Sequence, residues 1–265
     1  MIDELLSRIF FSQWVVLLTI SLLLLSFSEG GYRLGVLSRR KNAHAAESIG
    51  GSVQGAVLGL LGLLLGFSFA MSVGRYEARR ALVNDEANSI GTTWLRADFL
   101  PTPAREEIRA LLVRYTRMRI ERVASARDET EVLSISKESG EIHNALWAKG
   151  AAAASANPSP LSATFIVSLN ETIDLHSTRV FALRNHVPGA VWLLLMVVSG
   201  CSAWASGYSS GANGVRSFFN QLVFPILIGI VITLITDIDR PTKGLIGVSQ
   251  KPLEDLLETI QPPKP

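Results

Sequence analysis

The chain has 265 residues, of which 48% are hydrophobic and only 18% are charged, whereas a soluble domain usually carries about 25% charged residues. This composition favours the membrane class and excludes a disordered chain. A net charge of +2 excludes a polyanion-binding tail, and a single cysteine, Cys201, excludes an internal disulfide framework and a multi-cysteine metal site.

Four stretches without Asp, Glu, Lys or Arg are long enough to cross a bilayer, which takes roughly 20 apolar residues in a helix. They are residues 9–28, 48–74, 187–208 and 217–236. Only helices and closed barrels satisfy their backbone groups in lipid, and these stretches lack the alternation of a barrel strand. We therefore predict an all-α integral membrane protein with four transmembrane helices.

These spans divide the chain into four parts. Residues 1–74 hold the first two spans and a basic loop between them, residues 75–185 form a helical water-facing domain, residues 186–236 hold the last two spans, and residues 237–265 form a tail. Nine basic residues flank the side that carries both termini, and five flank the other side. This count places both termini in the cytoplasm, although the compact loop at 39–41 argues the other way.

The water-facing domain reads as a series of helices. The second span continues as a helix to Leu100, where Pro101 stops it, and Thr102 caps the next helix. That helix carries one apolar stripe, which predicts packing in a bundle: Ile108, Leu111, Leu112, Tyr115 and Met118. Two further helices are expected around residues 142–154 and 161–183, with a break at 157–160.

Arginines fill the rest of the helix at residues 103–127: Arg105, Arg109, Arg114, Arg117, Arg119, Arg122 and Arg127. The plainest interpretation is a solvated basic face, and the sharper alternative is a vestibule that attracts anions. Aromatic residues do not interleave with these arginines, so we expect no nucleic-acid partner.

The second span carries a stripe of glycines at spacings of 4, 4, 3 and 4, which places them on one helix face: Gly51, Gly55, Gly59, Gly62 and Gly66. Such a stripe indicates either close helix packing or a pore-facing surface, with Phe69 at its edge as an apolar constriction. No span contains a charged residue, which argues against a proton pump or an ion-coupled transporter.

Two motifs have catalytic interpretations that we reject. Residues 207–211 match the G-x-S-x-G nucleophile pattern, but they follow a predicted membrane helix, so we expect a flexible polar loop. A polar cluster of Asn170, Glu171, Asp174 and His176 suits a metal or an acid–base pair, but salt bridges to the nearby Arg179 and Arg184 are the commoner outcome. We therefore expect no enzyme, no metal and no cofactor.

Two segments resemble the bestrophins. The first follows the second span and includes Gly66-Phe67, Arg75, Glu77, Arg79, Asn84 and Asp85, and the second follows the fourth span with Asp237, Asp239, Arg240, Pro241 and Pro252-Leu253. The segment from Glu86 to Thr92 makes the chain still more similar to the bacterial bestrophin-like domain family, membrane proteins of unknown function. Ser68 stands where bestrophins have an arginine, and the acidic run of their calcium clasp is missing.

The resemblance implies a pentameric passive anion channel of the bacterial inner membrane, multi-pass, with cytosolic termini. By analogy, Gly59, Gly62, Gly66 and Phe69 would line a neck, with Arg75 and Arg79 below it. The implied partners are the lipid bilayer, further copies of the chain and small anions such as chloride. The alternative is a non-conducting membrane scaffold or sensor whose helical cytosolic domain binds a partner.

Overall fold

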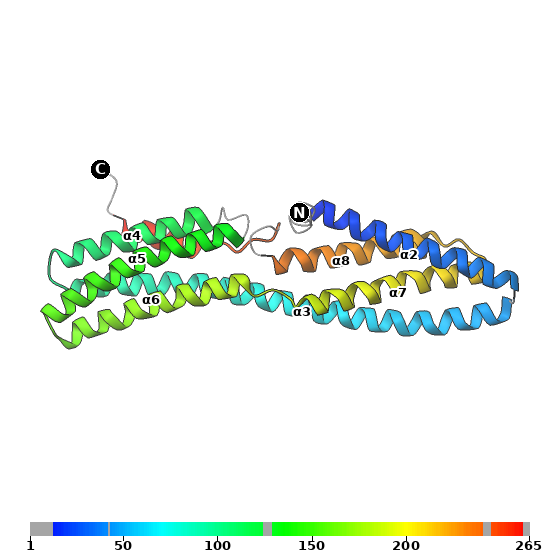
Figure 1. The fold of residues 1–265 in the computed structure, drawn as a ribbon, viewed down its shortest axis with the longest axis horizontal. Coiled ribbons are helices and arrows are strands. Elements are labelled where there is room, and N and C mark those ends of the chain that lie inside the picture. Colours follow the sequence, from blue (N-terminus) through cyan, green and yellow to red (C-terminus); the bar gives the residue numbers. More distant parts are fainter. Residues whose placement is uncertain (1–12, 42, 124–128, 241–244, 262–265) are drawn as a thin grey trace. The chain divides into compact units, whose positions relative to one another are not determined.

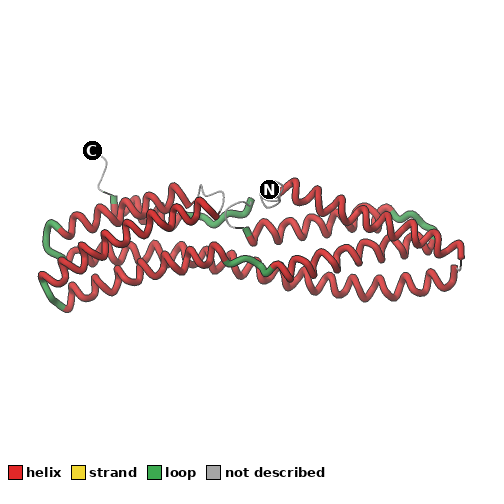
Figure 2. The backbone as a smooth tube through the Cα atoms, in the orientation of Figure 1, coloured by secondary structure: helices red, strands yellow, loops and turns green. Residues whose placement is uncertain are grey.

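The computed structural model describes residues 13–41, 43–123, 129–240 and 245–261, and all regular structure within them is helical (Figure 2). This confirms the predicted all-α class. In chain order the helices are α2 (Gln13–Lys41), α3 (Ala43–Arg96), α4 (Ala104–Val123), α5 (Glu129–Ala156), α6 (Pro160–Arg184), α7 (Gly189–Asn213), α8 (Phe224–Asp239) and α9 (Lys251–Ile260), with a 3-10 turn at Ala97–Phe99 and a π-helical turn at Phe219–Val223 (Figure 1).

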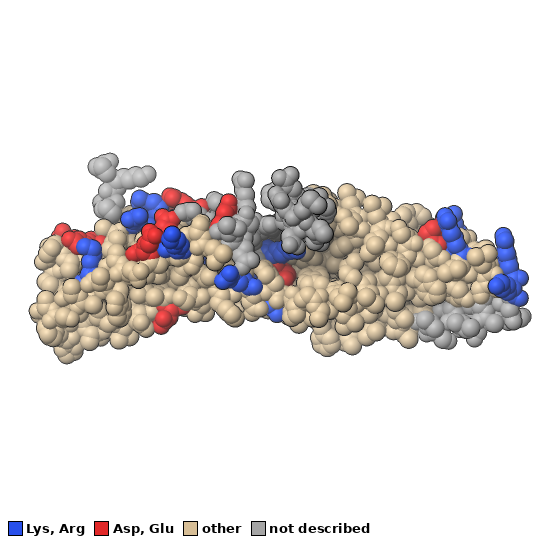
Figure 3. Space-filling view, in the orientation of Figure 1, with Lys and Arg blue, Asp and Glu red and all other residues tan. Residues whose placement is uncertain are grey.

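The chain forms two compact units. The membrane unit comprises residues 1–74 and 186–246, and the second unit comprises residues 75–185 and 247–265. Four apolar stretches in the described residues are long enough to cross a bilayer, which confirms the predicted multi-pass membrane protein. The face of the membrane unit seen in Figure 3 has a broad area without Lys, Arg, Asp or Glu.

Helix α3 belongs to both units. Its 54 residues contain no proline, so nothing interrupts the helix, and at 1.5 Å per residue it extends for about 80 Å. A bilayer core is only about 30 Å thick. The uncharged stretch of α3, which ends at Gly74, is long enough to cross that core, and most of the charged residues of the helix follow it.

Helices α2 and α7 pack with their backbones in direct contact. A Cβ atom on Gly31 would overlap the carbonyl oxygen of Trp204, and a Cβ atom on Gly207 would overlap that of Ser28. Gly35 and Gly211 repeat the same arrangement one turn further along. Close packing through small residues is therefore a property of α2 and α7 within the chain.

The structure corrects two expectations about these helices. The basic segment at 33–41 is helical rather than a loop, because no proline follows the first span there and α2 continues to Lys41. The G-x-S-x-G segment at 207–211 is also helical rather than a flexible loop, and all of its residues except Tyr208 are buried. Its glycines serve the close approach of two backbones, and its serines sit among them.

The second unit has its own apolar core, formed by the charged half of α3 together with α4, α5, α6 and α9. The predicted stripe of α4 supplies Ile108, Leu112 and Tyr115, each fully buried, which confirms that this helix packs in a bundle. Leu253 of α9 is also fully buried there. The core therefore combines residues from distant parts of the chain.

Candidate functional site

The glycine stripe of α3 lies on an uncovered face of the membrane unit. Gly59, Gly62 and Gly66 are exposed, Phe69 is 41% exposed, and a Cβ atom added to any of the three glycines would meet no atom within 4 Å. A different face of the same helix packs inward through Leu61, which is 3% exposed. The described part of a single chain therefore leaves this stripe without a packing partner.

The structure brings together only two of the five motif residues that follow this span. Arg75 donates from Nη1 to Asn185 Oδ1 at 2.7 Å, and Arg79 is buried and donates from Nε to the Arg75 carbonyl oxygen at 3.2 Å. The other three motif residues are exposed: Glu77, Asn84 and Asp85. The two arginines thus sit one helical turn apart at the start of the second unit.

The two aspartates after the fourth span are buried and bind backbone amides. Asp237 accepts hydrogen bonds from the amides of Leu245 at 2.7 Å and Ile246 at 2.9 Å. Asp239 accepts from the amide of Val187, 3.1 Å from each of its carboxylate oxygens. These carboxylates fix the ends of two segments. Arg240 is partly exposed, and Pro241 lies outside the described residues.

A group of buried charged and polar side chains lies in the second unit, around the carboxylate of Glu86 on α3. Arg119 of α4 donates from Nε to Glu86 Oε1 at 3.0 Å, and Arg179 of α6 donates from Nη1 to Glu86 Oε2. Arg179 also donates from Nη2 to the side-chain oxygen of Gln250, just before α9. All three charged side chains are at most 4% exposed. We call Glu86, Arg119, Arg179, Tyr115, His143 and His176 the buried ionic cluster.

Aromatic rings close one side of this cluster. Tyr115 donates its hydroxyl proton to Glu86 Oε1 at 2.6 Å, so the Tyr115 hydroxyl oxygen can accept a hydrogen bond from His176 Nδ1, which lies 3.2 Å away. The His143 ring of α5 contacts both: its centroid lies 4.8 Å from that of Tyr115 in a tilted arrangement and 4.9 Å from that of His176 in an edge-to-face arrangement. Four helices therefore contribute one side chain or more to a single polar site inside an apolar core.

The electrostatics of the cluster favour one charge state. Burial by itself would raise the pKa of Glu86, but the two adjacent guanidinium groups and the Tyr115 hydroxyl lower it to about 2. Burial lowers the pKa of His143 to about 4, and burial and the Arg119 charge lower that of His176 to about 3. At neutral pH both histidines are uncharged, and the cluster carries one net positive charge.

Sequence reasoning missed this cluster. The sequence placed His176 in a local polar cluster and made Arg179 a salt-bridge partner of that cluster. In the structure His176 contacts Tyr115 and Arg179 pairs with Glu86, while Asp174 stays exposed and accepts from Asn170 at 3.0 Å. Within the described ranges, no group of three or more His, Cys, Asp or Glu side chains is placed to bind a metal. One feature of the sequence pointed to the cluster. Arg119 falls four residues after Tyr115, on the apolar side of α4, where a buried arginine needs a counter-charge.

The arginines of α4 have separate roles. Arg119 is buried in the cluster, so the expectation of a solvated basic face is wrong for this residue. Arg109 lies over the Trp94 ring, 3.9 Å from its centroid, and donates to Asp98 at 2.7 Å. Arg114 and Arg117 are exposed, and Arg122 and Arg127 lie outside the residues whose side chains are described. The basic face is thus smaller than the sequence suggests.

The Bestrophin-like domain family matches the chain over residues 22–253. The chain belongs to this family. The match covers both units, from the first span to α9, and confirms the resemblance found in the sequence. No curated protein matches this chain.

Solved structures show the same fold at low identity. A variant of a bacterial bestrophin homologue from Klebsiella pneumoniae is 17% identical, with a TM-score of 0.62 over 89% of this chain and 94% of that one. A second variant of that homologue is also 17% identical, with a TM-score of 0.64 over 92% and 96% of the two chains. A further structure, described as a membrane protein, is 16% identical, with a TM-score of 0.63 over 92% and 95%.

Proposed function

We propose that this bestrophin-like membrane protein forms a ring of identical subunits, five by analogy with bestrophins. In this arrangement the α3 helices surround a passive pathway for small anions such as chloride, with both chain termini in the cytoplasm. The observation that carries the proposal is the uncovered glycine stripe of α3. A glycine stripe of this kind lets a membrane helix pack closely against another copy, or it faces a shared pore.

Within the chain, close packing is assigned to other glycines. The backbones of α2 and α7 touch at Gly31 and Gly207, whereas a Cβ atom on Gly62 of α3 would meet nothing within 4 Å. The α3 stripe is therefore not explained by packing inside the subunit. A ring places it at the subunit boundary or at the axis, where glycine leaves space and exposes backbone dipoles.

The chemistry of the stripe suits passive conduction. The span from 48 to 74 has no ionisable side chain, so it offers no proton relay and no charged substrate site. In this proposal Phe69, at the edge of the stripe, narrows the shared lumen with an apolar ring that closes by dewetting. Such a pore needs no coupled energy source.

Two measurements test this proposal on the full chain. Native mass of the detergent-purified protein should give a closed oligomer, and reconstituted vesicles should show a chloride flux. We expect Gly62→Leu to reduce the flux strongly and Phe69→Ala to increase it. Gly30→Leu is the matched control, because Gly30 of α2 lies just after the first span and also has no atom within 4 Å of its added Cβ. A monomer, or equal flux in all variants, would refute the channel.

One observation favours the alternative of a scaffold or sensor. The second unit exposes large apolar side chains, with Phe181 at 71%, Val167 at 65% and Leu95 at 62%. Such exposed apolar side chains are available for a partner to bury. An oligomer that conducts nothing, together with a partner whose binding is lost in Phe181→Asp, would select the scaffold instead.

A further inference from the structure

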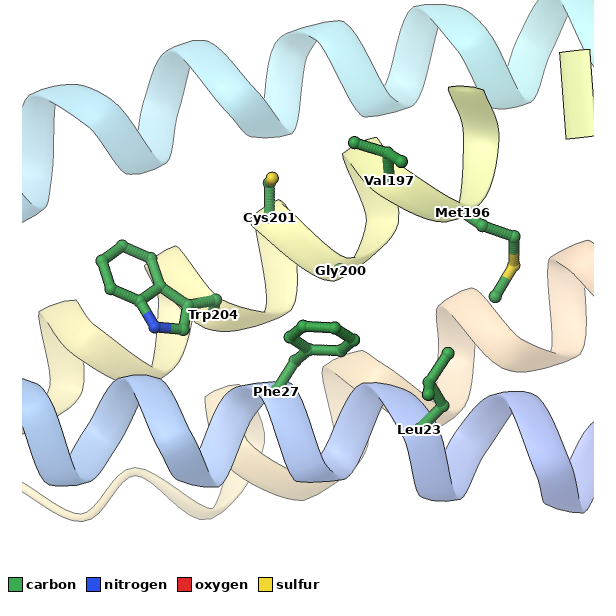
Figure 4. Close-up of a pocket in the computed structure, with 7 residues that line it drawn as sticks. All are labelled: Leu23, Phe27, Met196, Val197, Gly200, Cys201 and Trp204. Atoms are coloured by element: carbon green, nitrogen blue, oxygen red, sulfur yellow. The ribbon is translucent and has the colours of Figure 1, made fainter. Parts of the chain in front are cut away.

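The membrane unit has an apolar groove along the seam between α2 and α7. Its volume is about 430 Å³, and Leu23 and Phe27 form the α2 side (Figure 4). The α7 side is formed by Val197, Gly200, Cys201 and Trp204. Gly200 lies beside the Phe27 ring, and a Cβ atom there would be 3.5 Å from that ring, in van der Waals contact.

The position of the groove in the spans determines whether it faces lipid or water. Leu23 and Phe27 belong to the first span, and Val197 to Trp204 belong to the third. Val197 is 54% exposed and Leu23 is 44% exposed. In a bilayer, apolar side chains exposed at this depth meet hydrocarbon rather than water.

We propose that this groove binds an acyl chain of a membrane lipid. A flexible hydrocarbon chain fills an apolar hollow and replaces contacts that the lining side chains would otherwise lose. The groove offers no charged group and no buried polar network, so a polar ligand would lose its hydrogen bonds on entering. A lipid needs no such partner, because its headgroup stays at the membrane surface.

A second copy of the chain is the competing occupant, and the structure favours another place for it. A stripe of small residues left uncovered for close contact lies on α3, at Gly59, Gly62 and Gly66. Among the residues whose side chains the structure describes, those that line the groove come from α2 and α7 and not from α3. The inference rests on membrane insertion and not on conduction, so it survives if the protein proves to be a scaffold.

Quenching of Trp204 fluorescence by lipids with brominated acyl chains tests the proposal. In the full chain, Trp14→Phe and Trp192→Phe leave Trp204 as the remaining tryptophan of the membrane unit. The protein is reconstituted into phosphatidylcholine vesicles that contain a small fraction of the brominated lipid. We expect quenching of Trp204 to be several-fold greater than for a tryptophan on an ungrooved lipid-facing surface, because a bound chain stays next to the ring.

The matched control carries its membrane tryptophan on α8. Leu227 is 48% exposed, and Gly229 of the same helix contacts Ser21 of α2, so Leu227→Trp with Trp204→Phe reports a comparable depth. A third variant, Cys201→Phe in the Trp204 background, fills the groove and should remove the excess quenching. Unchanged quenching of the Leu227→Trp reporter, when it carries the same Cys201→Phe change, shows that this substitution leaves the fold intact.

Two outcomes would overturn the proposal. Quenching of Trp204 equal to that of the α8 control would mean that the groove is ordinary lipid-exposed surface. Absence of quenching, with disulfide formation between Cys201 residues of two copies on oxidation, would mean that a second subunit occupies it. Cys201 is the only cysteine of the chain, so that crosslink has a single interpretation.

Discussion

Replacing Glu86 by glutamine should sharply destabilise the second unit. Glu86→Gln keeps the size of the side chain but leaves Arg119 and Arg179 buried without their counter-charge. The pKa of Glu86 is lowered from 4.5 to about 2, which corresponds to about 3 kcal/mol in favour of the charged form. Breaking a buried ion pair by removing one partner costs about 3–5 kcal/mol. We therefore expect the free energy of unfolding of this unit to fall by about 3 kcal/mol.

Urea unfolding in detergent measures this change through the fluorescence of Trp94 and Trp147, the two tryptophans of the second unit. The three tryptophans of the membrane unit are first replaced by phenylalanine, so that they contribute no signal. The transition midpoint then reports the second unit alone. A shift of the midpoint at constant slope can be converted into a change in stability.

Glu107→Gln is the matched control for this measurement. Glu107 pairs with Lys149 on the surface of the same unit, and both side chains are more than 40% exposed. Exposed ion pairs contribute about 0–1 kcal/mol, so this variant should unfold almost as the wild type does. The reasoning is refuted if Glu86→Gln loses no more stability than Glu107→Gln.

Three further perturbations have expected outcomes. Below pH 6.5 the unfolded chain binds protons that His143 and His176 do not bind in the folded state, because their folded pKa values are about 4 and about 3. Stability of the second unit should therefore fall with acid, by about 2 kcal/mol per histidine at pH 5, and urea midpoints of a double glutamine variant should depend less on pH. Gly207→Leu should separate α2 from α7 and lower the melting temperature in detergent, whereas Gly30→Leu should leave it unchanged. Asp237→Asn loses one of two carboxylate acceptors, and hydrogen exchange at the two amides it binds should become faster.

The sequence was sufficient to predict features that depend on local composition. The four uncharged stretches predicted the spans, and the stripe from Ile108 to Met118 predicted the buried face of α4. Pro101 predicted the end of the long helix, which finishes at Arg96 and is followed by a short 3-10 turn. Each of these signals lies within one or two helical turns, where periodicity and helix breakers decide the structure.

The remaining features depend on which helices meet. Glu86 and Arg179 lie 93 positions apart, and no local pattern connects them. The glycines at 31 and 207 looked unremarkable beside the longer stripe of α3, yet they let the backbones of α2 and α7 touch. The family resemblance predicted the arrangement of helices, but not which glycines touch each other.

The position of α9 has a consequence for how the protein is made. Leu253 of this helix is part of the core of the second unit, and Gln250 just before it is bound by Arg179. The other helices of that unit leave the ribosome before α7 and α8 enter the membrane. The second unit must therefore wait, incomplete, until the later spans are inserted and α9 is synthesised. A premature stop codon between Asp239 and Gln250 would thus damage the unit encoded by the middle of the gene.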